Sequence, residues 1–288
     1  MKIIMICFAF ILLISCQNFG ELKLKSNLPK QLEEVSGIEK IKNNELLWML
    51  NDSGNKSIIY AVDITGEIIR EVAVNAKNND WEDIASDEKG NLYIADFGNN
   101  DNKRKNLKIL KINHQDLLEK DIVDVEKIKF SYASQNNFPP KKKKRFFDAE
   151  SLIYKNGFLY IFTKSRVKNK YGITTLYKIP AEKGNHVAKR ISTFETCNDL
   201  PCWITAAAIS SDGKKVALLN GQSVFILTDF IGDDFLSGQI KEFPLGHVSQ
   251  KESITFKNNN TLYIADEKAH GKGGKLYEFS IKQTQSIT

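Results

Sequence analysis

Histidine and cysteine are scarce in this chain, with four of each in 288 residues. A zinc site needs several such ligands close together, and the two cysteines of the C-terminal half have too few beside them. The sequence also lacks a nucleophile elbow and the Ser, His and Asp order of a serine hydrolase, which argues against that class of enzyme. No long stretch has the periodicity of a helix, and residues 114–122, the one partial match, are expected to form a loop turn.

Long apolar runs are absent apart from one at the N-terminus. Residues 3–14 are apolar, follow Lys2, and are too few to cross a bilayer as a permanent helix. The run ends in "LISC", which resembles a bacterial lipobox. We therefore predict a lipoprotein signal peptide over residues 1–15, cleaved before a lipidated Cys16; the alternative is a plain export signal with a chance cysteine.

An export signal at the N-terminus also suggests roles for the other three cysteines. Cys7 lies in the export signal, and Cys197 and Cys202 flank a short loop with a proline. Outside the reducing cytosol such a pair is expected to form a structural disulfide.

Charge is modestly positive, with a formal net charge of +6. Five of the basic residues form the run "KKKKR" at 141–145, which either contacts an anionic surface or is a solvated loop. Because the chain is expected to be exported, we predict no nucleic-acid partner, and we expect a monomer.

A unit of strand, tight turn and strand recurs along the chain. Its five copies begin at Ser36, Glu82, Glu150, Ala207 and Glu252. Each copy is followed by two further strand-like runs, except the last, which has one. Repeats of about 50 residues with four short strands are typical of propeller blades. We predict an all-β protein, a five-bladed β-propeller with four antiparallel strands per blade.

The last blade lacks a strand, and residues 21–27 can supply it from the other end of the chain. The predicted organisation is a signal peptide over 1–15, an anchor segment and closing strand over 16–30, and the propeller over 31–288.

Two columns of residues are expected to ring the mouth of the central channel. The first column is the set of five residues that begin the repeats, three of them glutamates. The second column ends the second strands and consists of Asn51, Asp96, Thr163, Asn220 and Asp266. Glutamates around one axis repel each other unless a positive charge neutralises them.

Calcium is the predicted neutralising ion, because it prefers about six to eight oxygen ligands and no histidine or cysteine falls in either column. The predicted ligands are Glu82, Glu150, Glu252, Asp96, Asp266 and Asn51. The alternative is that the acids pair with Lys164, Arg166 or Lys251. Trp48, Trp81 and Trp203 are expected to pack in the core rather than stack on a ligand.

Several short motifs occur in a familiar order: "NDSG" at 51–54, "DWEDIA" at 80–85, "DFGNN" at 96–100, "FDAESL" at 147–152 and "ITAAAISSDGKKVAL" at 204–218. They resemble the SdiA-regulated family of exported bacterial propellers, which is distantly related to NHL-repeat propellers. The resemblance covers the chain from about residue 30 and implies a five-bladed propeller with a bound calcium ion. The chain departs from the family pattern at Ala207, where an acidic residue is expected.

Three functions are compatible with these features. The favoured one is a lipid-anchored propeller of the bacterial cell envelope that binds a ligand or partner at the channel rim, with calcium in a structural role. The second is a calcium-dependent hydrolase of the lactonase or phosphoesterase type. The third is a scaffold in an envelope complex. The lack of an obvious base or nucleophile in the columns favours the non-enzymatic readings.

Overall fold

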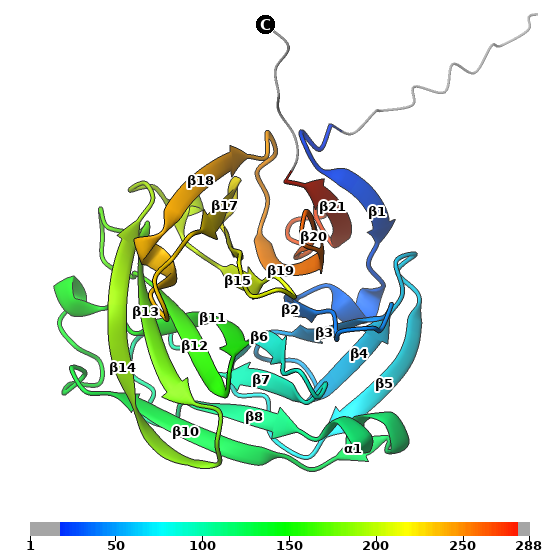
Figure 1. Ribbon diagram of the computed structural model, residues 1–288, viewed down its shortest axis with the longest axis horizontal. Coiled ribbons are helices and arrows are strands. Elements are labelled where there is room, and N and C mark those ends of the chain that lie inside the picture. The colour runs from blue at the N-terminus through cyan, green and yellow to red at the C-terminus, as the bar shows by residue number, and fades with distance from the viewer. Residues whose placement is uncertain (1–17, 282–288) are drawn as a thin grey trace, which may run out of the picture.

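The computed structural model describes residues 18–281, which form an all-β fold with the strands arranged around a central axis (Figure 1). The predicted signal peptide and Cys16 lie outside the described residues. Within the described part, no helix is long and apolar enough to cross a membrane. Residues 114–122 are not only a turn as expected: α1 (His114–Glu119) is a short helix whose first turn is capped by the Asn113 side chain.

The described strands form four hydrogen-bonded sheets. The first is a meander to which a short parallel strand is added, and it consists of β2 (Val35–Glu39), β3 (Leu47–Asn51), β4 (Ile58–Val62), β5 (Ile68–Val74) and β9 (Ile122–Val123). The second sheet has eight strands: β6 (Trp81–Ser86), β7 (Leu92–Asp96), β8 (Lys108–Ile112), β10 (Glu126–Tyr132), β11 (Asp148–Lys155), β12 (Phe158–Lys164), β13 (Ile173–Pro180) and β14 (Gly184–Glu195).

The other two sheets have four strands each. One consists of β15 (Ala206–Ile209), β16 (Val216–Leu219), β17 (Ser223–Thr228) and β18 (Gln239–Pro244). The other consists of β19 (Lys251–Asn258), β20 (Thr261–Asp266), β21 (Lys275–Ser280) and β1 (Lys23–Asn27). Between residues 18 and 281, four one-turn 3-10 helices lie in the loops, at Lys30–Leu32, Lys142–Lys144, Leu200–Cys202 and Phe235–Ser237.

The sheet pattern differs from five separate sheets of four strands. β10 and β14, the outer strands of two antiparallel meanders, pair with each other in parallel and fuse the meanders into the eight-stranded sheet. The expected closure at the other side is present, because β1 pairs antiparallel with β21 and so joins the two ends of the described chain.

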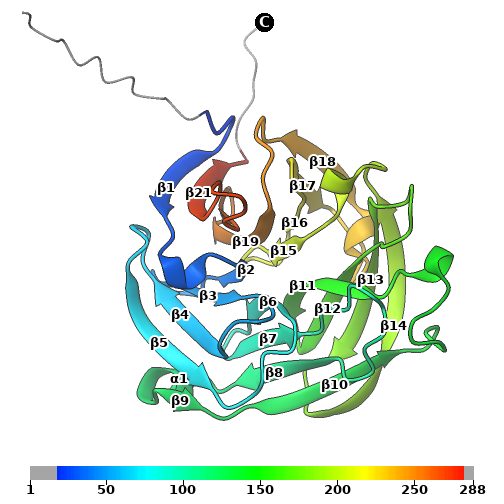
Figure 2. The same ribbon diagram turned by 180° about the vertical axis from the view of Figure 1, so that it is seen from behind.

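The core lies between neighbouring sheets around the axis. One cluster packs Leu32 from the first 3-10 helix and Leu47 and Met49 from β3 against Tyr263 and Leu276 from the last strands. The innermost strands β2, β6, β11, β15 and β19 approach the axis, as Figures 1 and 2 show from both sides.

β2 lies close to β6 at Gly37, where a Cβ atom would lie 3.0 Å from the Asp83 backbone.

Four of the five innermost strands contain a β-bulge near their first residues. The pairing register shifts between Val35 and Gly37 in β2, and equivalent shifts occur in β6, β11 and β19 but not in β15. The residues skipped by these shifts are Ser36, Glu82, Glu150 and Glu252. A bulge redirects a side chain out of the regular alternation. We call this end of the innermost strands the bulge end.

Candidate metal-binding site

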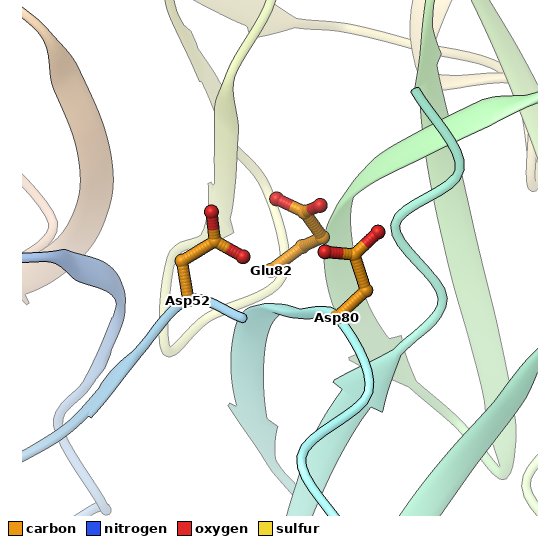
Figure 3. Close-up of side chains that lie close together, drawn as sticks. All are labelled: Asp52, Asp80 and Glu82. Carbon is orange, nitrogen blue, oxygen red and sulfur yellow. The ribbon is translucent and has the colours of Figure 1, made fainter. Parts of the chain in front are cut away.

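Three carboxylates meet at the bulge end, as Figure 3 shows. Asp52 follows β3, Asp80 precedes β6, and Glu82 is the bulged residue of β6. One carboxylate oxygen from each lies within 4.8 Å of the others. We call these residues the acidic trio.

The backbone around the acidic trio is held by hydrogen bonds. Asn78 Nδ2 donates to the Asn51 and Asp52 carbonyls at 3.1 and 2.9 Å, which ties the loop before β6 to the end of β3. Gly98 closes the other side: a Cβ there would lie 1.9 Å from Glu82 Oε1 and 2.6 Å from the Asp80 carboxylate. A larger residue at position 98 would have to displace the carboxylates of Glu82 and Asp80, so glycine lets the two acids keep these positions.

Burial and neighbouring negative charges disfavour the ionised forms of the acidic trio. Burial, followed by the negative charges of Glu150, Asp52 and Asp80, raises the pKa of Glu82 well above its usual value. Burial raises the pKa of Asp52 to about 6, although the Ser53 amide opposes the shift and Asp80 and Glu252 add to it. Burial also raises the pKa of Asp80, which lies 3.8 Å from Arg104. Within residues 18–281, the Glu82 carboxylate has no ion-pair or hydrogen-bond partner. A bound cation would relieve the repulsion.

Glu150 has protein cations as partners instead. Its Oε2 lies 2.8 Å from Lys164 Nζ, and its Oε1 lies 3.5 Å from Arg166 Nη2 without forming a hydrogen bond. Arg166 also pairs with Asp148. Burial alone would lower the pKa of Lys164, but Glu150 and Glu252 outweigh it and the pKa is raised. Glu150 therefore follows the alternative prediction, in which an acid at the channel mouth pairs with Lys164 or Arg166.

Trp203 covers this pair of cations. Lys164 Nζ and Arg166 Cζ lie 5.2 and 4.8 Å from the centre of its ring, and its indole N–H donates to the Ser165 carbonyl at 2.6 Å. Trp48 and Trp81 are buried as expected, but Trp203 is only partly buried. The expectation of a purely core role is therefore wrong for Trp203, which takes part in cation–π contacts at the bulge end.

Glu252, in β19, lies on the side of the acidic trio away from Glu150. Among the described residues it has no ion-pair or hydrogen-bond partner, and its pKa is raised by burial while Lys164 and Arg166 oppose the shift. Nearby Glu267 has a pKa raised to about 8 by burial and then by Glu252 and Asp52. Lys251 pairs with neither: its ammonium donates to the Gly221 and His247 carbonyls at 3.1 and 2.8 Å.

The predicted ligands of the second column have other partners. Asp96 lies 2.8 Å from Arg104 Nη2, pairs with Lys108, and accepts a hydrogen bond from Asn79 at 2.7 Å. Asp266 accepts from the Lys275 amide and the Tyr277 hydroxyl at 2.9 and 3.0 Å.

Asn51 donates to the Gln31 carbonyl at 2.6 Å, and its buried Oδ1 has no partner. Of the six predicted ligands, the structure brings only Glu82 into the acidic trio.

Asp52 and Asp80 were absent from the predicted ligands. Both are neighbours in sequence of a column residue, since Asp52 follows Asn51 and Asp80 stands two positions before Glu82. These two acids, each close in sequence to a column residue of neighbouring repeats, were the feature that could have predicted the site. The loop geometry that brings them together is not visible when the strands alone are aligned.

No known family model matches the chain, and no curated protein matches it. Solved structures resemble it in fold. An aldose sugar dehydrogenase from Streptomyces coelicolor, solved in its PQQ-bound form, is 11% identical, with a TM-score of 0.51, over 90% of this chain and 97% of that one.

A catalytically inactive virginiamycin B lyase from Staphylococcus aureus is 15% identical, with a TM-score of 0.42, over 88% and 68% of the two chains. The β-propeller domain of Swd1 from Myceliophteria thermophila is 10% identical, with a TM-score of 0.45, over 91% and 100%. At these identities the likeness concerns the fold alone, and the fold is β-propeller-like.

Proposed function

We propose that the chain is a five-bladed β-propeller of the SdiA-regulated, NHL-like type. The observation that supports five blades is the core: five hydrophobic clusters of the described residues each draw side chains from two successive groups of strands, and the last cluster joins the final group to the first. The fused eight-stranded sheet then corresponds to two blades whose outer strands pair in parallel.

The propeller binds a calcium ion at the acidic trio. The observation that carries this proposal is three close, partly buried carboxylates, of which Glu82 has no partner among the described residues. The donor set is oxygen only, which suits a hard cation. The buried Glu150 Oε1, also without a hydrogen bond, lies close enough for Glu150 to raise the pKa of Glu82.

The same end of the molecule binds a ligand or a partner protein, and the calcium ion holds it in shape. Trp203 and Tyr171 present partly exposed rings there, and Leu200 and Val248 on neighbouring loops are 54% and 65% exposed. A scaffold role in an envelope complex would use the same surface without a small molecule.

A calcium-dependent hydrolase is the second candidate. It is favoured by Glu267, a partly buried carboxyl group after β20 that accepts a hydrogen bond from Gln250 Nε2 at 3.1 Å, since a carboxylate near a bound cation can act as a general base. Calcium-dependent turnover of a lactone or phosphoester would establish it.

Thermal melting with calcium and with a chelator tests the metal site. Calcium in excess should raise the melting temperature of the wild type, because it binds only the folded state. Glu82→Gln and Asp52→Asn should abolish the increase without destabilising the chelated protein, since each removes a repelling charge.

Glu150→Gln is the matched comparison. Removing its charge leaves Lys164 without its ion-pair partner, whereas Arg166 keeps Asp148, and should lower stability by about 3 kcal/mol with chelator present. An unchanged wild-type melting temperature in calcium would refute the metal site.

The chain is further proposed to be lipid-anchored in the bacterial cell envelope, on the strength of the sequence at 1–16. Growth with a radioactive fatty acid should label the wild type and leave Cys16→Ser unlabelled. Label on the variant, or none on the wild type, would contradict the anchor.

A further inference from the structure

Three loops at the bulge end carry a large excess of positive charge. They are residues 97–107, 133–147 and 165–172, and together they contain eleven lysines and arginines but one acid, Asp101. The first and third follow the second strands β7 and β12, and the middle one precedes β11. Antiparallel pairing of β11 with β12 places the last two loops at the same end.

Direct contacts join the three loops into one surface. Asn102 Oδ1 accepts from the Phe147 amide at 2.9 Å, and the Asn102 carbonyl accepts from Gln135 Nε2 at 2.9 Å. The Arg166 amide donates to the Arg145 carbonyl, also at 2.9 Å. Lys105 Nζ lies 5.1 Å from the centre of the Phe138 ring. The loops therefore do not move as independent tails.

Two of the three arginines of these loops are turned inward and the lysines are turned outward. Arg104 and Arg166 pair with the buried carboxylates of Asp96 and Asp148. The exposed cations, which we call the lysine face, are Lys103, Lys105, Lys141, Lys142, Lys143, Lys144, Lys168 and Lys170.

Within residues 18–281, Lys103 is the one member with an ion pair, 2.7 Å from the exposed Asp101. The positive charge of the lysine face is therefore largely uncompensated.

Lysine and arginine recognise different partners. An arginine fork suits one carboxylate or phosphate held in fixed geometry, whereas lysines on flexible stems act as point charges toward a diffuse anionic layer. Exposed lysines spread over three loops fit a layer of anions better than a single bound anion.

The start of the described chain lies at this same end. Phe19 packs against His247, with ring centres 5.6 Å apart, and the Glu21 amide donates to the Leu245 carbonyl at 2.8 Å. Leu245 and His247 follow β18. The last residue of β18, Pro244, pairs with Ser223, which begins β17 directly after the loop 220–222 at the bulge end. The lysine face and the first described residues, near Phe19, thus lie at one end of the strands.

We propose that the lysine face binds the anionic phospholipid headgroups of a membrane and orients the propeller with its bulge end toward the bilayer. The choice of a membrane over an acidic protein rests on the proposed lipid anchor, which would hold this end close to lipid. Juxtamembrane lysines are attracted to anionic headgroups within about one Debye length of the surface.

Vesicle co-sedimentation tests the proposal without the anchor. A chain beginning at Asn18 keeps every described strand and core cluster and lacks the predicted anchor. It should bind vesicles of equal parts phosphatidylglycerol and phosphatidylcholine, ignore pure phosphatidylcholine, and be released by about 0.5 M NaCl. Replacing Lys141, Lys142, Lys143 and Lys144 with Gln should weaken binding roughly fivefold per lysine, about 100-fold or more in all.

The control removes the same charge from the opposite end. Lys42, Lys89, Lys183 and Lys214 are exposed and lie in turns at the far ends of their strands. Replacing these four with Gln should leave vesicle binding within about twofold of the wild type. Lys168→Gln with Lys170→Gln, on a second loop, should weaken it by about 25-fold.

Three outcomes would overturn the proposal. They are no binding to phosphatidylglycerol vesicles at low salt, equal losses in the two quadruple variants, and preferential binding of polyglutamate, which would assign the face to an acidic protein. The fatty-acid labelling of Cys16 can fail without changing any of these results, so the two ideas are separable.

Discussion

At the scale of single residues, position in the repeat does not decide the role of a side chain. Glu82, Glu150 and Glu252 occupy the same bulge position in three strands. Glu150 faces Lys164, whereas Glu82 faces Asp52 and Asp80. The nearest charge on a neighbouring loop therefore makes one glutamate part of an ion pair and another part of a candidate cation site.

Glu39, at the far end of β2, gives a pH-dependent prediction. It accepts hydrogen bonds from the Ser86 amide at 3.1 Å and from Thr255 Oγ1 at 3.3 Å. Burial raises its pKa to about 7. A raised carboxyl pKa stabilises the fold at low pH, and that contribution is lost as pH rises from about 4.5 to 7.

Glu39→Gln mimics the protonated form and should remove this loss. We expect it to be about 1–3 kcal/mol more stable than wild type at pH 8 and nearly equal at pH 4.5. Urea unfolding at both pH values measures the difference; a variant less stable than wild type at pH 8 would show that the ionised carboxylate is the stabilising form.

At the scale of elements, the loop before β15 is held by a disulfide bond and by a backbone hydrogen bond to a neighbouring loop. Cys197 and Cys202 form the predicted disulfide, with Cα atoms 5.5 Å apart. The Thr196 amide donates to the Gly172 carbonyl at 3.1 Å. At Gly172, a Cβ atom would lie 2.0 Å from the Cys197 carbonyl oxygen. This loop carries Trp203, so the disulfide helps to place the indole over the two cations.

Loss of the disulfide should destabilise the fold modestly. For so short a loop the double substitution Cys197→Ser with Cys202→Ser should cost about 2 kcal/mol, or roughly 4–8 °C in melting temperature. Calorimetry measures this, and intrinsic fluorescence should report a more solvated tryptophan. A melting temperature equal to wild type would show that the hydrogen bonds to loop 165–172 suffice.

At the scale of the whole molecule, the ring is closed by the pairing of strands from its two ends. β1 pairs with β21, and Leu22 is buried in the cluster that also contains Tyr277 and Phe279. Without β1, the edge of β21 would be open to pairing with another chain.

A chain beginning at Leu28 should therefore fold poorly. It lacks β1 and the burial of Leu22, and we expect a melting temperature at least about 10 °C lower, together with aggregation. The chain beginning at Asn18 is the control and should melt like the full protein. Equal melting of the two chains would show that closure by β1 is dispensable.

The sequence by itself determined the features that depend on local pattern. Turn residues between alternating strands repeat about every 50 residues, which predicts an all-β propeller, and the same pattern marked residues 21–27 as the closing strand. The disulfide was predicted from another local feature, the short loop with a proline between Cys197 and Cys202 in a chain expected to be exported. These follow from period and spacing, which a linear chain displays directly.

Only the tertiary structure decided which charges meet. Asp52 and Asp80 reach Glu82 from two different loops, whereas Asp96, another aspartate at the bulge end, pairs with Arg104 and Lys108. The parallel pairing of β10 with β14 was also invisible in the sequence, because it depends on how two outer strands approach. Electrostatic energy depends on distances of a few ångströms between residues far apart in the chain, and folding alone sets those distances.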